Sequence, residues 1–191
     1  MTLHTVNNLG LLYTNQGKLG EAEKIYQRAL EGYEKALRRD HTSTLSTVNN
    51  LGLLYADQGK LGEAEKMYQR ALEGYEKALR PELAASYIPA LNTVYNLGLL
   101  FASQGDISRA REMYSRALVG YQKVFGHDHQ ECQDIQERLS TLHISASEKN
   151  TSADATVGRT PIVSQGILHS IARTNTPVSK RRRLLQKLGW R

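Results

Sequence analysis

The nine residues TVNNLGLLY occur at Thr5–Tyr13 and again, unchanged, at Thr47–Tyr55, and a third version, TVYNLGLLF, occupies Thr93–Phe101. The identity extends further, since residues 2–38 and 44–80 agree at 33 of 37 positions. The third copy runs from 91 to about 125 and is displaced by 46 positions instead of 42, because four residues are inserted between the second and third copies. A repeat of this length predicts a solenoid of stacked units.

Within one repeat the apolar residues follow helical spacing. Between residues 19 and 37 they recur every three or four positions, which predicts an amphipathic helix. Val6, Leu9 and Tyr13 share one side of an earlier helix. Gly17 separates the two helices and supplies the backbone freedom for a turn. Each repeat is therefore predicted as a helix, a turn and a longer helix, and such a pair buries both apolar sides only when pairs stack.

The alternation of small and large residues resembles the tetratricopeptide repeat. The matching positions are Leu9-Gly10, Tyr13, Ala22, Tyr26 and Ala29, then Leu51-Gly52, Tyr55, Ala64, Tyr68 and Ala71, then Leu97-Gly98, Phe101, Ala110, Tyr114 and Ala117. The extended unit, its NNLG opening and its Asp-His linker resemble the kinesin light chain, and also the repeat arrays of STAND-type (NB-ARC or NACHT) signalling NTPases. The resemblance implies an all-α fold, a right-handed tetratricopeptide α-solenoid of three helix-turn-helix repeats plus a capping helix.

The periodicity and the charge divide the chain in two. The repeat domain is predicted at residues 1–145, with repeats at about 2–38, 44–80 and 91–125 and a capping helix at 129–144. Residues 146–191 lose the periodicity and are rich in Ser, Thr and Gly, which predicts a disordered tail. This tail holds 9 basic and 2 acidic residues, against 16 and 17 in the repeat domain, so it accounts for the net charge of +6.

A second row of recurring residues lies opposite the packing side of each first helix. The resemblance implies that these helices line a concave groove, in which an asparagine holds the backbone of an extended peptide; an amide offers both a donor and an acceptor. The candidate peptide-binding residues are Asn8, Leu11, Asn15, Asn50, Leu53, Asp57, Asn96, Leu99 and Tyr95. The alternative is that the asparagines bond a neighbouring repeat or water. Peptide binding is less strongly indicated for Asn7 and Asn49 than for the other asparagines, since the third repeat has Tyr95 there.

The segment from His127 to Cys132 contains residue types that bind metals, namely His127, Asp128, His129 and Cys132. However, Asp40-His41 occupies the same linker position in an earlier repeat, where no further ligand type lies nearby. A linker and helix start are therefore favoured, and neither a metal nor a cofactor is predicted.

Acidic pairs recur near the start of the second helices, at Glu21/Glu23 and Glu63/Glu65. We expect them to lie on a solvated surface, where negative charge favours the helix dipole. The sequence has neither a glycine-rich phosphate loop nor a nucleophile elbow. It therefore predicts a protein that is not an enzyme.

The tail ends in a basic cluster: Lys180, Arg181, Arg182, Arg183 and Lys187. Such a cluster is typical of a nuclear-import signal or of a patch for nucleic acid or anionic membrane, and an incidental solubilising tail remains open. The single cysteine and the lack of a visible secretory signal favour the cytoplasm, with the nucleus as the alternative.

Together these observations predict a non-enzymatic protein–protein interaction module that binds an extended peptide segment in the concave groove. Two alternatives stay open: a spacer or sensor arm from a larger STAND-type NTPase, and tail-mediated binding of nucleic acid or membrane. Because the chain begins inside a repeat unit, we expect a fragment of a longer array. Its uncapped ends would allow self-association.

Overall fold

The structure is a computed structural model that describes residues 2–151, and the side chains of residues 2–142. All regular elements in this part of the chain are α-helices. They are α1 (Leu3–Asn15), α2 (Leu19–Leu37), α3 (Thr42–Asp57), α4 (Leu61–Ala78), α5 (Pro81–Ala84), α6 (Ile88–Ser103), α7 (Ile107–Phe125) and α8 (Gln130–Thr151). Among these residues no helix combines the length and apolar character needed to span a bilayer.

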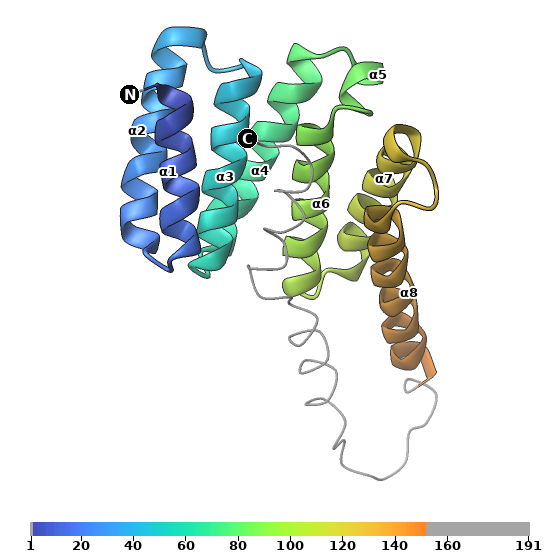
Figure 1. The fold of residues 1–191 in the computed structure, drawn as a ribbon. Coiled ribbons are helices and arrows are strands. Elements are labelled where there is room, and N and C mark those ends of the chain that lie inside the picture. The colour runs from blue at the N-terminus through green and yellow to red at the C-terminus, as the bar shows by residue number, and fades with distance from the viewer. Residues whose placement is uncertain (1, 152–191) are drawn as a thin grey trace. The chain divides into compact units, whose positions relative to one another are not determined.

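Six of the helices form three antiparallel pairs, α1 with α2, α3 with α4, and α6 with α7 (Figure 1). The pairs stack in chain order, because α2 packs against α3 and α4 packs against α6. This arrangement confirms the predicted all-α tetratricopeptide solenoid. The predicted disordered tail lies outside the described residues, except for its first few.

The two helices of each pair approach closely at a glycine. A Cβ atom added to Gly52 would lie 2.8 Å from two ring carbons of Tyr68, which is closer than such atoms come in proteins. The equivalent contacts join Gly10 to Tyr26 and Gly98 to Tyr114. All three tyrosines are buried. Only glycine therefore leaves room for the aromatic ring that fills the space between the helices.

The turns inside the pairs depend on glycine for a different reason. Gly17, Gly59 and Gly105 have φ angles of 74°, 75° and 79°. These values lie in the left-handed region, where a side chain is strained. The turn predicted after the first helix is confirmed in all three repeats.

The inserted residues between the second and third repeats contain the short helix α5. Pro81 occupies its first turn, where the missing backbone N–H costs nothing. The side chains of Leu72, Leu91 and Val119 line a pocket of about 330 Å³ beside this insertion. The sequence predicted the insertion but not its helix.

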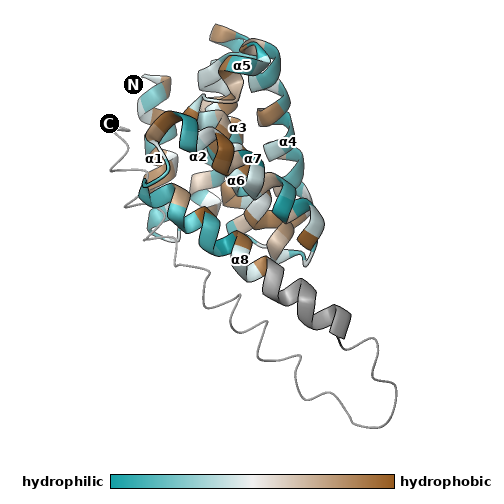
Figure 2. Ribbon diagram, turned by 90° about the vertical axis from the view of Figure 1, so that its right-hand side faces the viewer, coloured by the Kyte–Doolittle hydropathy of each residue, from teal (hydrophilic) through white to brown (hydrophobic). Residues whose placement is uncertain are grey.

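Helix α8 covers the third repeat. Cys132, Ile135 and Leu142 are buried in the same cluster as the core of α6 and α7, whereas Gln136 is exposed. Figure 2 shows the coloured part of α8 as mainly hydrophilic with few apolar positions. The sequence predicted a capping helix that ends at 144, but α8 continues to Thr151. Residues 145–151 contain neither proline nor glycine, so nothing in them stops a helix.

Candidate peptide-binding surface

The first helices of the three repeats are neighbours, with α1 beside α3 and α3 beside α6. This places Asn8, Asn50 and Asn96 at the same position of successive repeats, and we call these three residues the amide row. Asn8 is exposed, while Asn50 and Asn96 are half-buried. The structure therefore puts these three asparagines on neighbouring helices, and their role in peptide binding stays a prediction.

The other asparagine of each pair connects neighbouring repeats. Asn50 Nδ2 donates a hydrogen bond of 3.4 Å to Asn7 Oδ1, and Asn96 Nδ2 donates one of 3.3 Å to Asn49 Oδ1. Asn49 Oδ1 also accepts a 3.1 Å hydrogen bond from Thr93 Oγ1. The alternative, bonding between repeats, is thus what the structure has for Asn7 and Asn49, and Asn50 and Asn96 take part in the same bonds as donors.

The bridges occupy only part of each amide. An asparagine side chain has two N–H donors and a carbonyl oxygen with two lone pairs. Asn50 and Asn96 each use one N–H for the bridge. Within residues 2–142, their carbonyl oxygens have no hydrogen-bond partner. Asn8, which has no preceding repeat in the structure, bonds His4 Nε2 at 3.1 Å instead.

The leucines predicted for this surface are half-buried in all three repeats: Leu11, Leu53 and Leu99. Leu99 also packs against the core of the third repeat. Asn15 and Asp57 lie at the ends of their helices, Asn15 exposed. Each first helix therefore presents part of a leucine next to the amide row, and in the third repeat this leucine also takes part in packing.

Tyr95 has a more enclosed position than the sequence suggested. Its ring lies 5.7 Å from the ring of Tyr114, and the guanidinium of Arg138 on α8 lies 5.8 Å above it. Tyr95 is half-buried. It connects the third repeat to α8.

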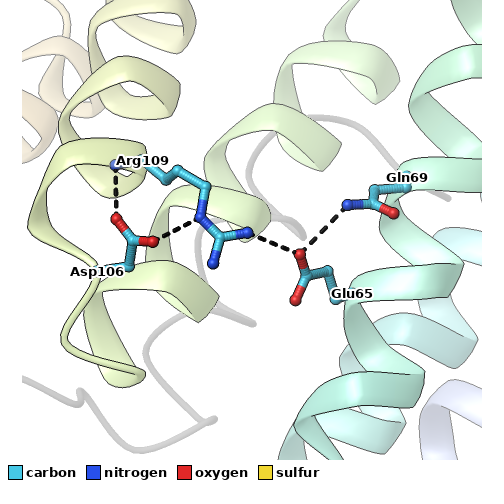
Figure 3. Close-up of polar contacts among 4 residues, drawn as sticks. All are labelled: Glu65, Gln69, Asp106 and Arg109. Atoms are coloured by element: carbon cyan, nitrogen blue, oxygen red, sulfur yellow. Dashed lines mark hydrogen bonds and ion pairs between the residues drawn. The ribbon is translucent and has the colours of Figure 1, made fainter.

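Glu65 bridges the second and third repeats (Figure 3). Its Oε1 atom lies 3.0 Å from Arg109 Nη1 and accepts a 3.3 Å hydrogen bond from Gln69 Nε2. Asp106 holds Arg109 through its guanidinium Nε at 2.6 Å and its backbone N–H at 3.0 Å. Glu65 is half-buried and its partner Arg109 is exposed, so this glutamate lies at the surface, and its ion pair with the next repeat was not predicted.

Glu23 has the same role between the first and second repeats. Its Oε2 accepts hydrogen bonds from Gln58 at 3.0 Å and from Lys60 at 3.5 Å. The hydrogen bond from Gln58, together with the charge of Lys60, holds the pKa of Glu23 below its ordinary value. The other acidic residues of the two pairs, Glu21 and Glu63, are exposed as predicted.

The segment from His127 to Cys132 forms the linker after α7 and the start of α8. Cys132 is buried, its Sγ donates to the backbone oxygen of Gly126 at 3.3 Å, and burial raises the pKa of its thiol. The His129 ring stacks on Phe125 with 4.4 Å between centroids. Among the described residues no group of three or more His, Cys, Asp and Glu could hold a metal ion. In the earlier linker, His41 Nδ1 accepts from the Ser43 N–H and caps α3.

The basic cluster of the tail lies outside the described residues. It comprises Lys180, Arg181, Arg182, Arg183 and Lys187. The proposals of nuclear import and of nucleic-acid or membrane binding therefore stay predictions.

Solved structures share the fold. A putative kinesin light chain of Podosopora anserina with nearly identical TPR-like repeats has a TM-score of 0.67 and 20% identity, over 96% of this chain and 92% of its own. A single-substitution variant of that protein has a TM-score of 0.66 and 19% identity, over 97% of this chain and 92% of its own. BtubC (BKLC) from P. vanneervenii has a TM-score of 0.66 and 20% identity. The match covers 97% of this chain but only 64% of the length of BtubC. None of these three is described as a STAND-type NTPase.

Family models identify the repeats themselves. Tetratricopeptide repeat models match residues 2–77 and residues 91–131, which together make up more than half of the chain. A comparison with curated proteins finds no match. Tetratricopeptide repeats generally form a non-enzymatic scaffold and mediate binding to other proteins. The fold, the glycine–tyrosine packing and both matches agree, and the chain belongs to the tetratricopeptide repeat family.

Proposed function

We propose that the protein binds an extended peptide segment of another protein along the amide row. The observation that supports this most is the partial use of Asn50 and Asn96. Each has one N–H in a bridge to the preceding repeat and keeps its carbonyl oxygen without a partner within residues 2–142. Because the bridge fixes the side chain, little conformational entropy is lost when a ligand binds the remaining atoms.

The spacing of the helices suits an extended chain. Packed helices lie about 8–10 Å apart, and an extended peptide advances about 3.3 Å per residue. A peptide that crosses α1, α3 and α6 therefore presents one peptide group to each helix about every three residues. An amide can accept from the peptide N–H with its oxygen and donate to the peptide carbonyl with its second N–H.

The side chains beside the amide row restrict the ligand. Leu11, Leu53 and Leu99 are half-buried and offer apolar contact. None of the candidate peptide-binding residues on these helices is a lysine or an arginine. Capture of a peptide's C-terminal carboxylate is therefore disfavoured, and we expect an internal segment with apolar residues at intervals of about three.

A peptide-array screen with the full chain tests the proposal. The variant Asn50→Ala/Asn96→Ala removes the amides proposed to hold the ligand. The matched control Asn7→Ala/Asn49→Ala removes the acceptors of the same two bridges but leaves the amide row in place. We expect the first variant to bind the selected peptide about tenfold more weakly or worse, and the control to bind it roughly two- to threefold more weakly. Equal losses in two variants with unchanged helical circular dichroism would mean that the amide row does not hold the peptide.

A further inference from the structure

One leucine position has two different environments in the three repeats. Leu54 and Leu100 are 0% and 3% exposed, because the preceding repeat covers them. Leu54 packs in a cluster with Ala22 and Tyr26 of that repeat. Leu12, at the same position of the first repeat, is 48% exposed. The side of the first repeat that contains Leu12 thus corresponds to a side that is an interface elsewhere in the chain.

We call this side the leading face and define it by five residues: Asn8, Leu12, Gln16, Lys18 and Arg28. Their counterparts in the second repeat are the same residue types: Asn50, Leu54, Gln58, Lys60 and Arg70. The four differences between the two repeats fall at other positions. The leading face therefore has the same residue types as the equivalent side of the second repeat, which the first repeat covers.

The polar partners in that occupied interface are mostly acidic. Gln58 and Lys60 bond Glu23, and Arg70 forms an ion pair with Glu34. On the leading face the counterparts of these three donors are exposed. Lys18 lies over its own Tyr13 ring at 5.7 Å. The side chains of Gln16 and Arg28 have no hydrogen-bond or ion-pair partner within residues 2–142. The face thus offers donors and positive charge around an apolar centre.

We propose that the leading face binds a tetratricopeptide helix pair whose second helix has the sequence type of α2. The partner would present alanine and tyrosine at the positions of Ala22 and Tyr26, and glutamates at those of Glu23 and Glu34. Its apolar residues cover Leu12, and its glutamates pair with Lys18 and Arg28. This face is separate from the amide row, apart from Asn8.

The described part of the chain does not supply this partner surface. The corresponding sides of α2 and α4 are covered by the following repeats, and α8 covers that of α7. At the third repeat, Arg111 stands at the position of Glu23 and Gln122 at that of Glu34. Two leading faces would also bring two basic surfaces together, and like charges repel. The occupant is therefore a repeat with an unoccupied second helix, and a second copy of this chain does not fit.

A thiol at position 12 reports on the face. In a Leu12→Cys variant of the full chain the introduced thiol is exposed, while the native Cys132 is buried and its labelling gives a low background. The probe is a synthetic peptide of residues 2–38. We expect the probe to slow maleimide labelling of the introduced thiol in a saturable manner. A labelling rate that falls with the concentration of the chain alone, without probe, would overturn the proposal in favour of a second copy.

Charge reversal tests the recognition. In the Leu12→Cys background, Arg28→Glu is expected to weaken binding of the probe about fivefold or more. A probe with the change Glu34→Arg is expected to restore binding to that variant. The matched control is Lys24→Glu, an exposed residue on the same helix whose counterpart Lys66 forms no ion pair within the described side chains. The same loss with Lys24→Glu and with Arg28→Glu would show a nonspecific charge effect and overturn the assignment.

A covalent fusion tests the same contact without requiring a free peptide to fold when it binds. A further copy of residues 2–43 is fused in front of Thr2 in the Leu12→Cys chain. We expect the introduced thiol to become as protected as the buried Leu54 position. If this thiol reacts as fast in the fused chain as in the unextended chain, the leading face does not accept the repeat. The variant Asn50→Ala/Asn96→Ala is expected to keep this protection, so the test is independent of the proposed peptide surface.

Discussion

Asn96 on α6 donates its side-chain N–H to Oδ1 of Asn49 on α3 across 3.3 Å. The same acceptor also takes a 3.1 Å hydrogen bond from Thr93 Oγ1. One asparagine thus holds two side chains of the following repeat, and Asn7 holds Asn50 in the same manner. The two asparagines of the NNLG motif form opposite ends of these bonds: the first accepts from the following repeat, and the second donates to the preceding repeat and also belongs to the amide row.

Replacing Asn49 by alanine is expected to destabilise the repeat domain by about 1–2 kcal/mol, because the half-buried Asn96 loses its acceptor and the buried Thr93 loses one of two. Urea unfolding followed by circular dichroism measures the change. The control is Asn8→Ala, which removes an exposed side chain bonded only to His4; it is expected to change the free energy of unfolding by less than about 0.5 kcal/mol. Equal effects of the two substitutions would refute the bridging role of Asn49.

Two glycines of the second repeat should respond to alanine in opposite directions. A methyl group on Gly52 would meet the Tyr68 ring, so Gly52→Ala is expected to cost about 1–3 kcal/mol. Nothing lies within 4 Å of a Cβ at Gly62, so Gly62→Ala is expected to be neutral or to stabilise by up to ~1 kcal/mol through helix propensity. Thermal unfolding of the two variants checks the sign. A stabilising Gly52→Ala would contradict the close approach of the helices.

The bridge at Glu23 predicts a pH dependence. The pKa of Glu23 in the folded protein lies below its ordinary value of 4.5. Ionised Glu23 therefore stabilises the fold above that value, and the contribution is lost as the pH falls through the folded pKa. In Glu23→Gln, the free energy of unfolding should fall less steeply between about pH 5 and pH 3 than in the wild type. The matched variant Glu21→Gln, on the exposed part of α2, should keep the wild-type slope; identical slopes for all three proteins would exclude the bridge.

The helix pairs could be predicted from the sequence because their determinants are local and repeated. Apolar spacing within 19–37 defines one helix, and Gly17 marks its separation from the previous one. The packing of Gly52 on Tyr68 followed from the small-and-large pattern of the family. The end of α8 at Thr151 does not follow from the polar composition after residue 144, because polar residues without a proline or glycine can continue a helix.

The details of the surface depended on distances between repeats, which sequence spacing does not give. The bond from Asn50 to Asn7 joins residues 43 positions apart, and the contact of Arg138 with Tyr95 requires α8 to be placed. One signal was available for the ion pairs. Arg109 stands where the second repeat has Glu63, and Asp106 stands where it has Lys60. This exchange of charges indicates that position 65 meets a positive side chain of the following repeat.

Asn96 is proposed to bind the backbone of a peptide, and a double-mutant cycle that changes both Asn96 and one peptide bond tests this most directly. A peptide selected by the full chain is compared with its analogues N-methylated at single peptide bonds, against both the wild type and Asn96→Ala, by isothermal titration calorimetry. If Asn96 accepts from one peptide N–H, methylation of that bond should weaken binding to the wild type by about 1 kcal/mol more than binding to Asn96→Ala. Methylation losses that are the same for both proteins at every bond would contradict the claim.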